Sequence, residues 1–129
     1  MKRIALAFAT LALAACATLP AASATTGTST ARYGETANVG PLLVRAIALV
    51  EDSRCPINAR CVWAGRLVIK AHVTFNGGSE TLTTNMTLGT PLVLGRESVT
   101  LVAGEPGKLA GAEGNPPANR FTFEYGTAR

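Results

Sequence analysis

Apolar and polar residues alternate with a period of two along much of the chain after residue 31. In residues 67–75 the odd-numbered positions are Leu, Ile, Ala, Val and Phe, and most even-numbered positions are polar. Because successive side chains of a strand point to opposite faces, this segment predicts a half-buried strand with its odd positions toward the core. Asn76-Gly77-Gly78 then favours the positive φ angles of a tight turn, and residues 82–88 predict the returning strand of a hairpin.

Five further segments predict strands, at residues 36–39, 42–50, 92–94, 99–102 and 121–125. The second of them is nearly all apolar, which suits a central strand and also a short helix. Pro41 precedes it and indicates an edge, a bulge or a turn, because proline cannot donate to a ladder. Phe121, Phe123 and Tyr125 share one face of the last strand, which predicts packing in the core. About seven short strands separated by Gly and Pro predict an all-β fold, a small antiparallel β-sandwich or a partly open barrel.

The first residues of the chain have the layout of an export signal. Lys2 and Arg3 precede an apolar run, 4–15, that is interrupted only by Thr10 and is too short to span a bilayer as a helix. The run ends in Leu-Ala-Ala-Cys, which resembles the lipobox of bacterial lipoprotein signals. The resemblance implies cleavage before Cys16 and lipidation of that cysteine. Ala17 is not the Asp that retains some lipoproteins at the inner membrane, so the implied location is the outer membrane.

A second cleavage site remains open. Ala22-Ser23-Ala24 fits the small-x-small site of ordinary exported proteins, and cleavage there would remove Cys16 and release a soluble periplasmic protein. Residues 21–31 are almost all Ala, Ser, Thr and Gly, a composition that buries too little apolar surface to order itself. The predicted organisation is therefore a signal peptide at 1–15, a flexible tether at 16–31 and one β-domain at 32–129.

Charge and cysteine content narrow the function classes. The chain has 12 basic and 8 acidic residues; without Lys2 and Arg3, 10 basic residues remain, for a net charge of +2. The remaining cations are scattered singly, which argues against a nucleic-acid partner. Once Cys16 is lipidated or removed, Cys55 and Cys61 are an even pair in an oxidising compartment, which predicts a disulfide. That bridge would close a loop of about seven residues and stabilise the domain by roughly 2.4 kcal/mol.

The cysteines lie in the densest group of chemically distinctive residues in the chain. Asp-Ser-Arg-Cys-Pro at 52–56 is followed, after four residues, by Cys-Val-Trp-Ala-Gly at 61–65. This DSRCP-x4-CxWAG signature resembles that of a family of small exported bacterial proteins for which no activity is established, and the resemblance extends from about Gly34 to Tyr125. Trp63 shares the odd parity of the following strand, which predicts that it packs in the core near the bridge. Arg54 or Arg60 can pair with Glu51 or Asp52.

The remaining chemistry of the sequence does not predict an enzyme. Two thiols and His72 are too few for a zinc site, and the spacing of the cysteines is not that of a thioredoxin-like motif. His72 falls on the polar face of its strand, and Glu51 and Asp52 would point to opposite faces, which disfavours shared acid–base chemistry. No phosphate-binding loop or nucleophile elbow is present in the sequence. No cofactor or metal is therefore expected.

The longest segment without a strand pattern is 103–119, which holds four Gly and three Pro. Loops of this length in a compact domain are often functional, and binding residues tend to lie on such loops. Lys108, Leu109 and Glu113 are the candidate contacts with a protein or cell-wall partner; an excursion without a role is the alternative. We expect a lipid-anchored envelope protein with a non-enzymatic binding or structural role. An inhibitor of a lysozyme or protease that acts through this loop is the second hypothesis.

Overall fold

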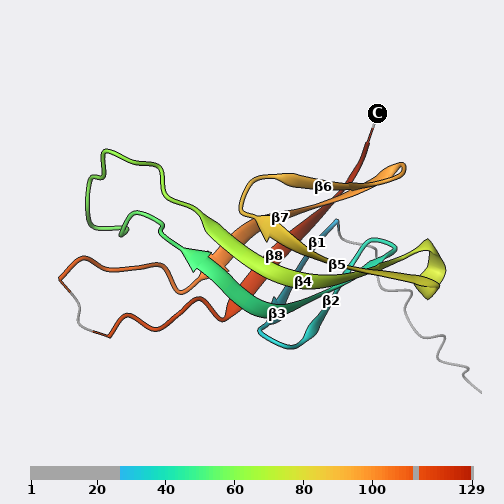
Figure 1. Cartoon of the computed structure of the whole chain (residues 1–129), viewed down its shortest axis with the longest axis horizontal. Helices are drawn as coiled ribbons and strands as arrows, with labels where there is room; N and C mark the ends of the chain where they lie inside the picture. Colours follow the sequence, from blue (N-terminus) through green and yellow to red (C-terminus); the bar gives the residue numbers. More distant parts are fainter. Residues whose placement is uncertain (1–26, 112–113, 129) are drawn as a thin grey trace, which may run out of the picture.

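The computed structural model describes residues 27–111 and 114–128, and its regular elements are β-strands joined by turns and loops. Two antiparallel sheets of four strands each pack face to face, with the orders β1-β8-β7-β6 and β2-β3-β4-β5 (Figure 1). In chain order the strands are β1 (Thr28–Arg32), β2 (Thr36–Val39), β3 (Leu42–Asp52), β4 (Leu67–Phe75), β5 (Glu80–Thr87), β6 (Pro91–Leu94), β7 (Glu97–Glu105) and β8 (Arg120–Thr127). The short 3₁₀ turn η1 (Asn76–Gly78) joins β4 to β5.

The predicted all-β sandwich is confirmed, with eight strands in place of about seven. Residues 42–50 belong to a strand, β3, and not to a helix. Within the described residues, no helix is long and apolar enough to span a membrane.

The core lies between the two sheets and follows the predicted alternation. Leu67, Ile69, Ala71 and Val73 of β4 are each 0% exposed, as the odd positions of that strand require. The largest buried side chains are Phe121 and Phe123 of β8, a strand of the sheet that faces β4. The fully buried large residues are Phe121, Phe123, Leu42, Leu67, Ile69, Met86, Leu101, Val39, Val44, Val73 and Val99.

The predicted hairpin is confirmed by β4 and β5. Asn76, Gly77 and Gly78 have φ angles of 51°, 67° and 93°, so the turn uses the left-handed backbone region that these residues tolerate. The register runs from Val68 opposite Thr87 to Phe75 opposite Glu80 without a shift.

Two boundaries differ from those predicted. Residues 28–31 were expected to belong to the tether, but they form most of β1, which pairs with β8 from Thr28 opposite Glu124 to Arg32 opposite Arg120. Small polar residues suffice there because β1 is an edge strand whose ladder is supplied by backbone groups, and only Ala31 is buried. Residues 103–105 were expected to begin the long loop, but they continue β7, with Ala103 opposite Thr122 and Glu105 opposite Arg120.

Candidate functional site

Two long connections meet at one end of the sandwich, and we call this region the loop end. The disulfide loop, 53–66, joins β3 to β4, and the long loop, 106–119, joins β7 to β8. Figure 1 shows both extending beyond the sheets on the left, at the end opposite the β4–β5 turn. The DSRCP-x4-CxWAG signature and the candidate contact loop, which are about 50 residues apart in the sequence, are therefore neighbours in space.

An ion pair between Asp52 and Arg54 lies at the base of the loop end. Arg54 Nε is 2.7 Å from Asp52 Oδ1, and its Nη2 is 2.8 Å from Oδ2, which is the bidentate geometry of a strong pair. The Asp52 side chain is only 8% exposed and the Arg54 side chain only 16% exposed. Of the pairings that the sequence allowed between Arg54 or Arg60 and Glu51 or Asp52, the structure forms the one between Arg54 and Asp52.

Arg54 also connects the two loops. Its Nη1 donates to the carbonyl of Gly104 at 2.5 Å, and its Nη2 donates to the carbonyl of Pro106 at 3.2 Å. These carbonyls lie at the end of β7 and the beginning of the long loop, 50 and 52 residues further along the chain. One guanidinium therefore satisfies a carboxylate and two backbone acceptors, and the backbone of the long loop is fixed where it leaves the sheet.

The pKa values of this pair reflect its geometry. The side-chain hydrogen bonds from Arg54 lower the pKa of Asp52 below its ordinary value, against the opposing effect of partial burial, and the positive charges of Arg54 and Lys108 lower it further. The hydrogen bond with Asp52 in turn raises the pKa of Arg54. Both groups are therefore charged at neutral pH, and the pair adds stability that depends on the ionised carboxylate.

Lys108 has a structural position that sequence reasoning did not anticipate. Its Nζ donates to the backbone carbonyl of Asp52 and lies 4.0 Å from Asp52 Oδ1. The Lys108 side chain is 32% exposed and points toward the base of the loop end, where its positive charge lies beside the Asp52 carboxylate. Of the other candidate contacts, Leu109 is 44% exposed, and Glu113 lies outside the described residues.

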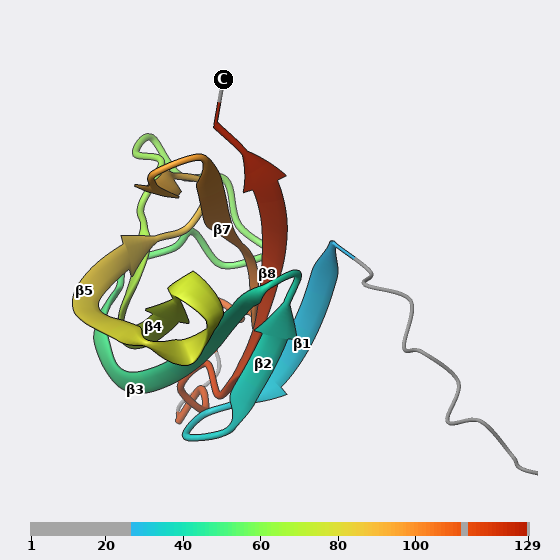
Figure 2. The ribbon, with the colours of Figure 1, turned by 90° about the vertical axis from the view of Figure 1, so that its right-hand side faces the viewer.

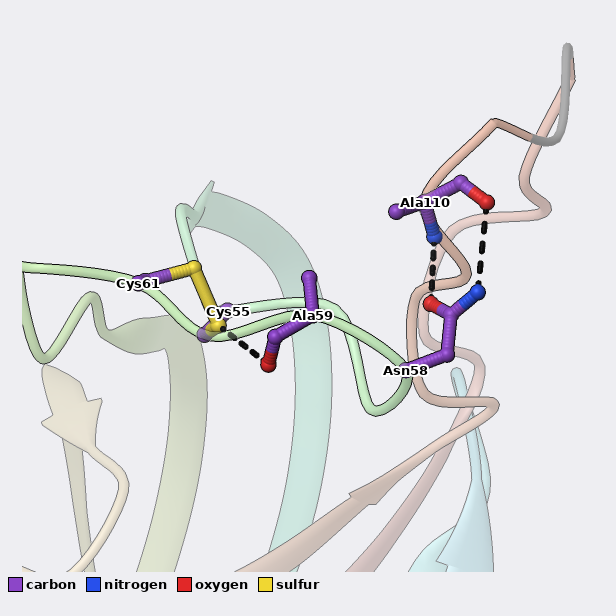
Figure 3. Close-up of a disulfide and its surroundings, with 5 residues drawn as sticks. All are labelled: Cys55, Asn58, Ala59, Cys61 and Ala110. Atoms are coloured by element: carbon purple, nitrogen blue, oxygen red, sulfur yellow. Dashed lines mark hydrogen bonds between the residues drawn. A yellow bond between two sulfur atoms is a disulfide. The ribbon is translucent and has the colours of Figure 1, made fainter.

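Further hydrogen bonds join the loops nearer their tips. Asn58 Nδ2 donates to the carbonyl of Ala110 at 3.3 Å, and the amide of Ala110 donates to Asn58 Oδ1 at 2.7 Å (Figure 3). The amide of Ile57 donates to the carbonyl of Lys108 at 2.9 Å. Asn115 accepts from the amide of Leu109 and donates to its carbonyl, which closes the long loop on itself. The two loops thus form one connected unit.

The predicted disulfide is present and constrains the first of the two loops. Cys55 and Cys61 are bridged, with their Cα atoms 5.8 Å apart, and Asn58 lies within the ring that the bridge closes (Figure 3). The bridge and the Asn58 contacts therefore act on the same few residues. The bridge limits the conformations of the segment, and Asn58 fixes its position against the long loop.

Gly65 is required by the path of the disulfide loop. Its φ is +62°, and a Cβ built there would lie 2.1 Å from the backbone carbonyl oxygen of Ser53. At the same place the amide of Ser53 donates to the carbonyl of Arg66 at 2.9 Å, and Ser53 Oγ donates to Glu51 at 2.8 Å. The two ends of the loop therefore approach too closely for any side chain at position 65.

The prediction that Trp63 packs in the core is wrong, because this side chain is 60% exposed. The odd parity that Trp63 shares with β4 does not predict its face, because the left-handed backbone at Gly65 interrupts the extended conformation between Trp63 and Leu67. Trp63 belongs instead to a group of exposed apolar side chains on the two loops. Ile57 is 77% exposed, Val62 is 98% exposed, and Leu109 completes the group.

Two open hollows lie at the base of the long loop. One, of about 440 Å³, is lined by Glu105, Pro106, Gly107, Asn119 and Arg120. The other, of about 490 Å³, is lined by Tyr33, Ala48, Leu49, Pro117, Ala118 and Asn119 and is the more apolar of the two. The loop end thus combines exposed apolar side chains with recessed surface at the base of the long loop.

The remaining polar groups of the sheets do not form a second centre. His72 hydrogen-bonds Thr83 across the β4–β5 pair at 2.8 Å, and Glu51 accepts from Arg66 Nε at 2.8 Å. Among residues 27–111 and 114–128, no group of three or more His, Cys, Asp and Glu side chains is arranged to hold a metal ion. Comparison of the chain with protein-family models, with curated proteins and with solved structures finds no match.

The close approach at Gly65 predicts a specific loss of stability. Gly77→Ala places a Cβ at φ +67° with no atom within 4 Å, so it should cost only the backbone strain of about 1 kcal/mol. Position 65 has a similar φ, but the Cβ of Gly65→Ala would also meet the Ser53 carbonyl. This substitution should therefore lower the free energy of unfolding, measured in urea, by about 3 kcal/mol in total. Equal losses of stability for the two variants would show that the two ends of the disulfide loop move apart without cost.

The Asp52–Arg54 pair predicts an acid-dependent stability. Because the pKa of Asp52 is lower in the folded than in the unfolded protein, its contribution is complete above the ordinary Asp pKa of about 3.9 and is lost as the pH falls below it. Asp52→Asn should therefore cost about 3 kcal/mol of unfolding free energy at pH 7, where it leaves the Arg54 charge without its carboxylate. The difference from the unsubstituted protein should narrow as the pH falls below about 4.

Glu105→Gln is the matched control for that measurement. Glu105 pairs with Arg120 at 3.7 Å, but the two side chains are 65% and 48% exposed, so this pair should contribute less than about 1 kcal/mol. Urea unfolding of the three proteins between pH 7 and about pH 2 measures both effects. If Asp52→Asn lowers the free energy of unfolding by no more than Glu105→Gln does, the Asp52–Arg54 pair does not stabilise the loop end as we infer.

Proposed function

We propose that this chain is an exported, lipid-anchored envelope protein that binds a protein partner through its loop end and performs no catalysis. The observation that carries the proposal is the exposure of Ile57, Val62 and Trp63 on a loop whose backbone is fixed by a disulfide and by contacts with the long loop. Exposed apolar side chains do not stabilise the domain itself, because only apolar surface that is removed from water does so. Their placement is instead typical of a binding surface.

The residue types fit a protein partner. Tryptophan and arginine are enriched among the residues that dominate protein–protein affinity, and Trp63 lies between the exposed Arg60 and Arg66 in the sequence. Burial of a tryptophan side chain removes about 150–250 Å² from water, so the exposed part of Trp63 offers about 2–4 kcal/mol. Val62 and Ile57 add apolar surface beside it, and the charged rim supplies orientation.

The bracing of the loops supports tight binding as well as exposure. A flexible loop loses conformational freedom when it binds, at a cost of about 0.5–1.5 kcal/mol for each side chain that is immobilised. Here the Cys55–Cys61 bridge and the Asn58–Ala110 hydrogen bonds restrict the loops before any partner arrives. The ordering cost is therefore largely met during folding.

The direction of β1 supports presentation away from an N-terminal lipid. β1 starts at Thr28, opposite Glu124, and ends at Arg32, opposite Arg120, where the long loop ends and β8 begins. The chain therefore enters the domain about 13 Å from the base of the loop end and runs toward it, at about 3.3 Å per residue. This direction leaves the loop end free to face away from the membrane surface in a protein attached through Cys16 by a flexible tether.

An inhibitor of a lysozyme or protease is the second candidate. A braced loop that projects beyond its sheets and carries a valine that is 98% exposed is suited to insertion in an active-site cleft. The two candidates differ in a direct assay, because only the inhibitor lowers the activity of a purified lysozyme or protease in proportion to its concentration.

The proposal predicts which substitutions abolish binding. Val62→Asp and Trp63→Ala should each weaken the recovery of an envelope partner, measured by affinity purification after chemical cross-linking, by about tenfold or more. Val93→Asp is the matched control, since Val93 is 57% exposed on β6, away from the two loops. Because all three positions are exposed, thermal stability should change little. Equal recovery with all four proteins would contradict binding through the loop end.

The lipid attachment has its own test. The intact mass of the exported protein should correspond to a chain that begins at Cys16 with a diacylglyceryl group, and Cys16→Ser should abolish the lipid and the membrane association. An unmodified chain that begins at Thr25 would instead establish cleavage after Ala24 and a soluble periplasmic protein. Either outcome leaves the loop end and its binding test unchanged.

A further inference from the structure

We propose that the edge of β5 pairs with the same strand of a second copy, so that two β2-β3-β4-β5 sheets join into one continuous antiparallel sheet centred on Thr84. The proposal is independent of the loop end. It rests on the length of this edge, on its lack of protective residues, on an exposed leucine and on the complementarity of the strand with itself.

Four strands form the edges of the two sheets, and they are unequal. β1, β2 and β6 have 5, 4 and 4 residues, whereas β5 has 8. β1 also lies beside β2, so these two edges cover one side of the sandwich, while β5 is at the margin of the other side (Figure 2). Short edges resist pairing with other chains, and a long regular edge favours it because its outward N–H and C=O groups have no ladder partner.

After Glu80 at its start, β5 lacks the residues that usually protect an edge. From Thr81 to Thr87 it contains no charged residue, no proline and no glycine. Its register with β4 has no shift, whereas the pairings of β3 with β4 and of β7 with β8 both have bulges. A charge, a proline or a bulge would obstruct an incoming strand. Here the backbone groups are presented in a regular row, and the chemistry that satisfies such a row is another extended strand.

Leu82 is the second observation. It lies on the same side of β5 as Met86, which is 2% exposed in the core, but Leu82 itself is 38% exposed. The alternation of β5 directs Leu82 toward the interior of the sandwich, and the open side of the sandwich leaves it uncovered. A strand added at this edge would cover it.

The sequence of β5 matches itself in the antiparallel direction. With Thr84 opposite Thr84, Leu82 lies opposite Met86 of the other copy, and Thr83 lies opposite Asn85. Apolar residues then meet on the core side, and hydrogen-bonding residues meet on the outer side, as cross-strand pairing favours. Glu80 falls opposite Leu88, so no like charges face each other. This self-complementarity is what a twofold interface requires, and it selects a second copy over an unrelated strand.

Cysteine cross-linking tests the register. Thr84→Cys places the two thiols across the twofold axis, where opposed Cα atoms are about 4.5–5.5 Å apart and can form a disulfide. Thr81→Cys is the matched control, because the register places it opposite Thr87 and about 20 Å along the strand from its own copy. Mild oxidation of the full exported chain in its envelope should give a covalent dimer with Thr84→Cys, at least tenfold more than with Thr81→Cys. Both variants keep the other cysteines of the chain, so any background from those cysteines is equal.

A second substitution distinguishes specific pairing from chance collision. Leu82→Lys in the Thr84→Cys protein should reduce the covalent dimer to a tenth or less, because two lysines would enter the interface, while circular dichroism shows a folded domain. Val93→Lys on β6 should leave the dimer unchanged. Equal cross-linking of Thr81→Cys and Thr84→Cys, persistence of the dimer with Leu82→Lys, the absence of a Thr84→Cys dimer, or a cross-link to a different protein would each overturn the proposal.

Discussion

The ion pair between Asp52 and Arg54 is the contact on which the loop end depends. Two charged groups that are 8% and 16% exposed lose most of their hydration, and that loss is offset only when every charge and acceptor nearby is satisfied. The guanidinium reaches the Asp52 carboxylate and the carbonyls of Gly104 and Pro106 together. The pair therefore stabilises the fold only in the one arrangement that brings both loops together, and this makes it a determinant of geometry as much as of stability.

The sandwich and its loop end are stabilised by different physical effects. Between the sheets, apolar side chains from alternating positions exclude water, and the buried residues of the described chain include no polar or charged side chain. At the loop end the contacts are hydrogen bonds, ion pairs and one disulfide. Among the described residues, no buried side-chain nitrogen or oxygen is left without a hydrogen-bond partner. Polar bracing of this kind allows apolar side chains at the tips to remain exposed, because they are not needed to order the loops.

The two proposed surfaces are on different parts of the molecule. The loop end extends beyond one end of the sheets, and the β5 edge lies along one side of the sandwich (Figures 1 and 2). Pairing through β5 would therefore leave both loop ends accessible. A dimer with two binding surfaces can engage a repeated or dimeric partner with greater avidity than either copy alone, provided that its geometry allows both contacts.

The sequence by itself determined most of the strands and the bridge. The alternation at 67–75, the Asn-Gly-Gly turn and the aromatic face of the last strand each reflect local geometry, and an even pair of cysteines in an exported chain predicts the Cys55–Cys61 disulfide. Local preference could not decide between strand and helix at 42–50, where the neighbouring strands on both sides supply the ladder. Nor could it identify β1, whose small polar residues become a strand only because β8 is beside them. Only the tertiary structure decided the loop end. Lys108 is directed inward because its partner, Asp52, lies 56 residues earlier in the chain at the base of the loop end. Trp63 is exposed because the left-handed backbone at Gly65 breaks the alternation before β4, and no periodicity within the loops records either effect.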